Sequence, residues 1–413
     1  MKAFPFLLSL LLAVSTLTSP AREIPQLTPA KAGLSEAKLA EVDRFMERAV
    51  AEQRIAGGMV MISHGGKVGF FHTYGLRDRE ANKPITPDTI FRIYSMSKAI
   101  TTAAALKLHD ARKIGLDDPV SKYIPSFAHL KVAGTNGLRV PARPMTVRDL
   151  MLHTSGLTYG SGPDALKEAY DRLKPLESAD LAEMAGKLAQ VPLAFDPGTD
   201  WCYGVGIDVL GRVIEVASGQ SLDVFLKDEI FNPLDMTDTA FSVPPEKLDR
   251  FAVNYTRSAD GLKVTNVFSE LKFTQPTTFF SGGGGLVGTA RDYLRFLTMI
   301  ERGGTLDGHR LLKSKTVKLM TSNQLPEAAF PIYFGEEKRH GTGFGLGFSV
   351  RTEITSWDPA GHVGEYGWGG AASTHYWVSP KDQLIVITLE QIVPYQRDTE
   401  FGVKKLIYDA VKK

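Results

Sequence analysis

Strand-like patterns gather near the two ends of the chain. Apolar residues run through 57–64 and alternate through 67–75, with a glycine pair between them, which predicts a β-hairpin. Near the other end, a turn signal at 379–382 separates two further strand patterns, and a helix is predicted over 398–412. The strands predicted in that region are 345–350, 373–378 and 383–389.

The middle of the chain carries helical periodicity instead. A first helix is predicted after Ser35, before the hairpin. Several later helices begin with Ser or Thr, and Thr146 with Asp149 three residues on predicts a capping box. The helices predicted between the two groups of strands are 95–112, 146–153, 163–173, 178–191, 204–218 and 222–231.

This order of elements predicts an α/β protein with a discontinuous domain. Residues 22–92 and 281–413 would form one α/β domain, and residues 93–280 would form an inserted helical domain. The active site is expected in the cleft between them. The length, 413 residues, fits two or three domains.

The first 21 residues predict a secretory signal peptide. Lys2 precedes a short apolar segment that ends in small residues, which predicts cleavage after Ala21 and a periplasmic or secreted protein. A membrane anchor is disfavoured, because the apolar stretch is interrupted and shorter than the roughly 20 residues that a span needs. Cys202 is the one cysteine, so neither an intrachain disulfide nor a lipid-attachment cysteine is expected.

Composition argues against several function classes. Lys and Arg (48) nearly balance Asp and Glu (46), and no basic block with interleaved aromatic residues occurs, so a nucleic-acid partner is not expected. No His-Glu-x-x-His spacing is present, so neither a metal nor another cofactor is expected. The glycine run 281–285 lacks the Gly-Lys-Ser/Thr ending of a phosphate loop and predicts a turn into a helix from Thr289.

A serine three residues before a lysine occurs three times, and the surroundings separate the copies. Ser35 and Lys38 open an amphipathic helix, where Ser35 fits an N-cap. Ser269 and Lys272 lie in a segment with no helical period. The first copy is therefore interpreted as a helix cap, and the second as a strand or loop serine.

The remaining copy, Ser95 and Lys98, opens an almost wholly apolar, alanine-rich helix. This spacing places both side chains on one face, at the helix end that carries free N–H groups. Burial would lower the lysine pKa from about 10.4 toward a range where the amine can accept a proton. The pair is predicted to serve an acyl-enzyme hydrolase.

Two other segments offer the remaining parts of such a site. Tyr203 lies on a turn between a Pro-Gly loop and an apolar helix, from which a phenol can project into a cleft. Residues 367–371 lead into the strand at 373–378, and their glycines would let a substrate lie along the strand edge. The N–H of Ala371 could then bind a developing oxyanion.

These three pieces, in this order, resemble the serine β-lactamase and penicillin-binding protein superfamily. The resemblance is to class C β-lactamases and to the family VIII carboxylesterases that share their fold, and it extends over nearly all of the mature chain. It implies an antiparallel sheet flanked by helices, with an inserted all-helical domain. Further segments that carry it are 89–92, 152–157, 197–199 and 281–285.

The resemblance also implies a role for each site residue. Ser95 would be the acylated nucleophile, Lys98 its proton partner, and Tyr203 the general base or its relay. The N–H groups of Ser95 and Ala371 would form the oxyanion hole. Proton transfer directly to Tyr203 and transfer through Lys98 both remain open, because a phenol and an ammonium in one cleft titrate as a coupled pair.

Two departures from the class C pattern bear on substrate. Val205 stands where those enzymes carry an asparagine, and Trp368 where they carry a lysine. Trp368-Gly369-Gly370 is the form found in family VIII carboxylesterases. We therefore expect Trp368, Gly369, Gly370 and Val205 to contact substrate, and uncharged esters to be preferred. The segment 362–364, His-Val-Gly, is a second-ranked candidate for the same strand motif.

His153 raises the alternative of a Ser-His-Asp triad. A histidine that caps a helix end is preferred, because no Gly-x-Ser-x-Gly elbow occurs in the chain.

The sequence thus predicts an exported serine esterase that acts on small-molecule esters, with no stable membrane anchor and with its oligomeric state open. One alternative is a β-lactamase or D-amino-acid peptidase, for which Arg351 or Lys338 would have to bind the substrate carboxylate. Another is a sensing module that is acylated by a β-lactam or peptidoglycan and does not turn over.

Overall fold

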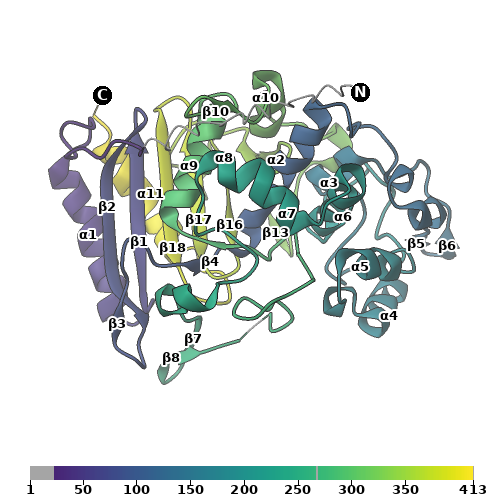
Figure 1. Cartoon of the computed structure of the whole chain (residues 1–413), viewed down its shortest axis with the longest axis horizontal. Coiled ribbons are helices and arrows are strands. Elements are labelled where there is room, and N and C mark those ends of the chain that lie inside the picture. Colours follow the sequence, from purple (N-terminus) through teal and green to yellow (C-terminus); the bar gives the residue numbers. More distant parts are fainter. Residues whose placement is uncertain (1–22, 267, 413) are drawn as a thin grey trace, which may run out of the picture.

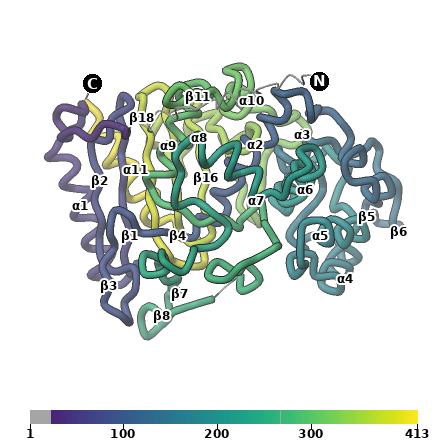
Figure 2. Tube along the Cα trace, in the orientation of Figure 1, coloured from purple at the N-terminus to yellow at the C-terminus, as the bar shows by residue number. Residues whose placement is uncertain are grey.

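Strands from both ends of the chain join in one antiparallel sheet. The computed structural model describes residues 23–266 and 268–412, so the predicted signal peptide lies outside the described residues. The sheet has eight strands in the order β14-β15-β16-β17-β18-β1-β2-β3. They are β1 (Gly57–His64), β2 (Lys67–Asp78), β3 (Lys83–Pro84), β14 (Thr342–Phe344), β15 (Ser349–Arg351), β16 (Tyr366–Gly370), β17 (Thr374–Ser379) and β18 (Leu384–Glu390). Figure 2 shows the purple and yellow ends of the chain side by side in this half of the molecule.

The central strands are covered on both faces. Along β1, Met59 and Met61 face one core while Val60 and Ile62 face another, as the alternation of a strand requires. The second core is closed by α1 (Glu36–Ala51) and α11 (Asp398–Ala410). Since both faces are buried, these strands are apolar throughout rather than alternating. The fold class predicted from the sequence is confirmed.

The predicted hairpin is confirmed by the pairing of β1 with β2, but the strand predicted at 345–350 is wrong. β14 ends at Phe344 and β15 begins at Ser349, with a turn between them. Gly347 has φ +92°, and a Cβ at Gly345 would lie 2.0 Å from the carbonyl oxygen of Met320. These glycines therefore serve a tight turn and a close approach, not a strand.

The predicted helices occur with boundaries shifted by a few residues. The capping box of Thr146 and Asp149 is present, and Thr289 caps the helix after the glycine run. The helix predicted from Ser95 begins at Ser97, after a single 3-10 turn at Tyr94–Met96, and the segment predicted to end at Phe231 finishes in a π-turn. The helices are α2 (Ser97–Asp110), α3 (Val147–Leu152), α4 (Asp164–Leu173), α5 (Leu181–Leu188), α6 (Gly206–Ser218), α7 (Leu222–Leu226), α8 (Asn232–Leu234), α9 (Ala290–Glu301) and α10 (Ser314–Thr321).

Short paired strands connect these elements. The pairing of β4 with β9 is important for the site. It places the segment before Ser95 next to the segment that follows the glycine run. The pairs are β4 (Phe91–Arg92) with β9 (Val287–Gly288), β5 (Val132–Gly134) with β6 (Gly137–Arg139), β7 (Tyr255–Ser258) with β8 (Gly261–Val264), β10 (Thr305–Leu306) with β11 (His309–Arg310), and β12 (Tyr333–Phe334) with β13 (Glu337–Lys338).

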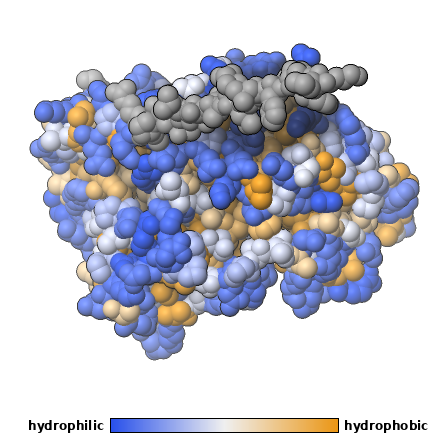
Figure 3. All heavy atoms as spheres, viewed as in Figure 1, coloured by the Kyte–Doolittle hydropathy of each residue, from blue (hydrophilic) through white to orange (hydrophobic). Residues whose placement is uncertain are grey.

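The helices α3 to α6 lie to one side of the sheet (Figure 1). One continuous core nevertheless joins Ile387 of β18 to Ala103 of α2 and Ile207 of α6. The division into residues 22–92 with 281–413 and residues 93–280 therefore stays a prediction. In the face drawn in Figure 3, hydrophobic residues lie in small groups among hydrophilic ones. Within the described residues, no helix is both long and apolar enough to cross a bilayer.

Candidate active site

Ser95 lies on a strained turn that leads into α2. The residue before it, Tyr94, has φ +40°, a left-handed conformation that a non-glycine residue adopts only when its surroundings hold it. Tyr94 is buried, and its hydroxyl accepts a hydrogen bond of 2.9 Å from the side-chain amide of Asn254. The turn therefore presents Ser95 in a fixed position at the wall of a cavity.

Lys98 lies one turn further on and is 2% exposed. Its Nζ donates to Ser95 Oγ at 3.1 Å, to the hydroxyl of Tyr159 at 3.2 Å and to the carbonyl oxygen of Gly283 at 2.6 Å. An ammonium has three donors, so these three acceptors satisfy it completely. The spacing in sequence therefore produces the expected contact with Ser95, and two distant segments complete the cage.

The glycine run packs against α2 and α6, which explains its composition. Asp208, at the start of α6, is buried and accepts hydrogen bonds from Ser281 Oγ (2.5 Å) and from the N–H of Gly283 (3.0 Å). A Cβ at Gly283 would lie 2.3 Å from an Asp208 oxygen, so a larger residue would push the loop away. This anchor holds the carbonyl of Gly283 on Lys98. The predicted turn is confirmed.

Tyr203 and Trp368 meet directly above Lys98. The indole Nε1–H of Trp368 donates to the Tyr203 hydroxyl at 3.2 Å, and the two rings are 5.3 Å apart. Lys98 Nζ lies 4.6 Å from the centroid of the Tyr203 ring. The hydrogen bond and the nearby amine fix the position of the phenol oxygen beside Ser95 and Lys98. Trp368 was predicted as an apolar wall, and the structure adds this polar contact.

Strand β16 ends against the turn that carries Ser95. A Cβ at Gly370 would lie 2.4 Å from the carbonyl oxygen of Ile93, so this close approach requires glycine. Pairing with β15 stops at Gly367, which leaves the backbone edge of 368–370 beside the cavity. Trp368 is thus part of a strand, where the sequence suggested a segment leading into one. Ala371 follows directly and lines the same cavity as Ser95.

The cavity has a volume of about 590 Å³, and its lining consists of Ser95, Tyr203 and residues between Phe334 and Lys404. Phe334 closes it on one side, with its ring 5.1 Å from that of Tyr203. The predicted substrate contact of Val205 is not supported, because this residue starts α6 and its side chain is fully buried away from the cavity lining. The predicted residues that do line the cavity are Ser95, Tyr203, Trp368, Gly369, Gly370 and Ala371.

His153 packs behind the site without joining a triad. It is the C-cap of α3, with φ +60°, and its ring lies 4.8 Å from that of Tyr203. Burial, and then the charge of Lys98, hold the pKa of His153 well below its usual value. The imidazole is therefore neutral at pH 7 and acts as packing. The sequence identified it as a cap but gave no sign that it would lie beside Tyr203.

The two rejected copies of the motif lie outside the cavity lining. Ser35 is the N-cap of α1, although its side chain makes no capping hydrogen bond, and Lys38 pairs with Glu41 at 3.2 Å. Ser269 lies in a turn, where its carbonyl accepts from Lys272. His362, in the second-ranked strand motif, bonds to Asp382 at 2.7 Å.

The sequence did not reveal Tyr159, Phe334 or Arg339 as site residues. Tyr159 follows α3 in a loop, and the other two come from the segment around β12 and β13. No local pattern marks them, since each reaches the site only through the packing of distant segments. Within the described ranges, no three His, Cys, Asp or Glu side chains come together as a metal-binding set.

A comparison with known families decides the relationship. The sequence model of the family described as Beta-lactamase matches residues 42–402. The chain belongs to the beta-lactamase family. It is a serine hydrolase of that fold.

Relatives within the beta-lactamase family include esterases. Protein Rv1367c of Mycobacterium tuberculosis is 35% identical over 82% of this chain and 86% of its own length. Esterase EstB of Burkholderia gladioli is 31% identical over 88% of this chain and 93% of its own. The solved structure of EstCE1, described as a hydrolase with promiscuous acyltransferase activity, has a TM-score of 0.79 at 27% identity, covering 90% of this chain and 99% of that one.

Replacement of Tyr159 by phenylalanine removes one of the three acceptors around the ammonium of this beta-lactamase-family chain. We expect kcat/KM for p-nitrophenyl butyrate to fall about tenfold, because Lys98 loses part of its orientation. Tyr170→Phe is the matched control, since its buried hydroxyl has no hydrogen-bond partner among the described residues. An unchanged kcat/KM for Tyr159→Phe would contradict this role.

Proposed function

We propose that this chain hydrolyses carboxylic esters through an acyl intermediate on Ser95. The observation that carries the proposal is the 3.1 Å contact between Ser95 Oγ and the buried Lys98 Nζ at the wall of the cavity. The hydroxyl proton passes to Tyr203, either directly or through Lys98, as Ser95 attacks the ester carbonyl, and the N–H groups of Ser95 and Ala371 bind the oxyanion. The proton then passes to the departing alcohol.

Hydrolysis of the intermediate reverses these roles. A water molecule gives its proton to the same base and attacks the acyl carbonyl, and Ser95 leaves as a hydroxyl after regaining a proton. Trp368 supports this cycle through its hydrogen bond to Tyr203, which holds the phenol oxygen in place. The base is therefore the coupled pair of Lys98 and Tyr203 rather than one isolated group.

An ester is favoured over a β-lactam as the acyl donor. An indole stands at position 368, where class C β-lactamases carry a lysine, and Val205 offers no amide to hold an acylamide side chain. The relatives named esterases support the same choice. Transfer of the acyl group to an alcohol is a second candidate, because the rings of Tyr203, Phe334 and Trp368 can bind an apolar acceptor.

Intact-mass measurement during turnover tests the proposal. With p-nitrophenyl butyrate we expect rapid release of nitrophenol, a transient adduct of one butyryl group, and return of the free protein. With nitrocefin we expect slow or no hydrolysis. A persistent β-lactam adduct would support the sensing alternative, and fast nitrocefin hydrolysis would support the lactamase. An added alcohol that captures the butyryl group as a new ester would show acyl transfer.

Export is part of this proposal. It rests on residues 1–21 of the sequence, which predict cleavage after Ala21 and a periplasmic or secreted enzyme. N-terminal sequencing of the protein isolated from its host tests this point.

A further inference from the structure

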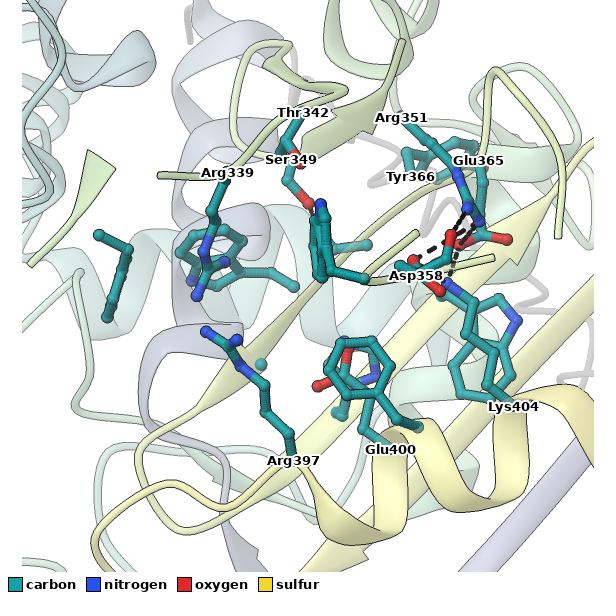
Figure 4. Close-up of a pocket in the computed structure, with 18 of the residues that line it drawn as sticks. Arg339, Thr342, Ser349, Arg351, Asp358, Glu365, Tyr366, Arg397, Glu400 and Lys404 are labelled. Atoms are coloured by element: carbon teal, nitrogen blue, oxygen red, sulfur yellow. Dashed lines mark hydrogen bonds and ion pairs between the residues drawn. The ribbon is translucent and has the colours of Figure 1, made fainter. Parts of the chain in front are cut away.

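Most lysine and arginine side chains that line the cavity are neutralised by nearby carboxylates. Lys404 and Arg351 share Asp358 and Glu365, His375 pairs with Glu400, and Arg397 binds both oxygens of Glu337. Figure 4 shows the first of these groups joined by dashed lines at one side of the pocket. Lys404 lies 2.8 Å from Asp358 and 2.5 Å from Glu365, and Arg351 lies 3.5 Å and 3.9 Å from the same two carboxylates. His375 lies 3.0 Å from Glu400, and Arg397 Nη1 lies 2.5 Å from Glu337.

Arg339 is the exception in this lining. Its ion pair is with Glu337 at 3.8 Å, which is beyond hydrogen-bond distance, and the same carboxylate already accepts two hydrogen bonds from Arg397. The Nε of Arg339 is buried and has no hydrogen-bond partner among the described residues. The side chain is 15% exposed, so solvent satisfies it only in part. A buried donor left in this state is unfavourable without a ligand.

Aromatic rings hold the guanidinium of Arg339 at the mouth of the site. Its central carbon lies 4.6 Å from the ring centroid of Phe334 and 5.7 Å from that of Trp368. Burial, and then the nearby charge of Arg397, lower the pKa of Arg339. An anion bound at this place would relieve both effects. Figure 4 shows Arg339 and Arg397 reaching toward each other across this part of the pocket.

We propose that Arg339 binds a carboxylate of the substrate, so that the preferred esters carry a negative charge. Monoesters of dicarboxylic acids are the simplest such class. A planar guanidinium can bind a carboxylate through two parallel hydrogen bonds. This inference rests on the proposed esterase function. It replaces the expectation of uncharged esters, because the cation lost at position 368 is supplied by another segment.

Trp368 connects Arg339 to the proposed catalytic residues. Its ring centroid lies 5.7 Å from the central carbon of Arg339, and its Nε1–H donates to Tyr203. Neither cation suggested by the sequence fits this position. Arg351 is held by Asp358 and Glu365, and Lys338 is exposed and outside the lining of this cavity.

The test is a charge preference measured within one protein preparation. p-Nitrophenyl monoesters of succinate, glutarate and adipate are compared with p-nitrophenyl butyrate. We expect at least one of the anionic esters to exceed butyrate about tenfold in kcat/KM, mainly through a lower KM, with the advantage shrinking as salt increases. Arg339→Gln should abolish this ratio, Arg339→Lys should retain part of it, and Lys338→Gln should leave it unchanged.

The outcomes separate this inference from the function on which it rests. Both substrates are measured on the same preparation, so a loss of folded protein cancels in the ratio. Hydrolysis that depends on Ser95 but shows no preference for any anionic ester would overturn the role of Arg339 alone. A preference for anionic esters that persists in Arg339→Gln would also overturn the role of Arg339 alone. Hydrolysis that survives in Ser95→Ala would instead overturn the proposed function.

Discussion

Ser95→Ala is expected to lower kcat/KM for p-nitrophenyl butyrate by about 10⁴-fold or more, since the acyl intermediate cannot form without the hydroxyl. The substitution removes one oxygen from a half-buried position and leaves Lys98 two of its three acceptors. The fold should therefore persist. Steady-state kinetics gives the rate, and intact mass should show no butyryl adduct at any time.

The chain supplies its own control for this experiment. Ser35 also stands three residues before a lysine, but it caps α1 and lies outside the cavity lining. Ser35→Ala should keep the wild-type rate, because its side chain makes no capping hydrogen bond. Retention of the activity by purified Ser95→Ala would show that another group carries the chemistry.

Lys98→Met is expected to lower kcat/KM about 10³-fold, within the range of general acid–base catalysis. Methionine keeps much of the length and apolar stem of lysine, so the buried position stays filled. What is lost is the group that contacts Ser95 Oγ at 3.1 Å. Lys107→Met is the matched control, because Lys107 lies on the same helix and pairs with Glu229 at 2.6 Å, outside the cavity lining.

Comparison with Tyr203→Phe addresses which group is the immediate base. Among the described residues, Lys98 makes a hydrogen bond to Ser95, whereas the Tyr203 hydroxyl accepts from Trp368. We therefore expect Tyr203→Phe to reduce the rate less, about 10²-fold. Accumulation of acyl-enzyme in either variant would assign that residue to deacylation. Activity of Lys98→Met within tenfold of the wild type would contradict a role for Lys98 in proton transfer.

Local patterns predicted those features whose physics is local. The contact of Ser95 with Lys98 follows from a spacing of three residues on a helical turn, and the capping box of Thr146 and Asp149 follows from one turn of α3. The hairpin of β1 and β2 follows from alternation around two glycines. Each of these depends on neighbours in sequence, so no other part of the chain was needed to predict it.

Adjacency in sequence does not bring Val205 to the cavity. It stands two residues after Tyr203, but the chain turns into α6 between them, and the side chain enters the core instead of the cavity. The strand predicted at 345–350 is wrong for a similar reason. Gly345 lies against a carbonyl group of α10, and Gly347 forms part of a turn. In both cases a contact with a distant segment decided the direction of the side chain or backbone.

The sequence by itself determined the fold family, the contact between Ser95 and Lys98, and the order in which Tyr203 and Trp368 follow. Only the tertiary structure decided that Trp368 donates to Tyr203 and that Arg339 lies beside them. The physical reason is that Trp368 and Tyr203 are 165 residues apart in the sequence, and that Arg339 lies in a segment without periodicity. No spacing of residues in the sequence therefore encodes these contacts. The proposed charge of the preferred ester therefore depends on the packing of distant segments. The residues proposed for the acyl chemistry, Ser95 and Lys98, lie only three positions apart.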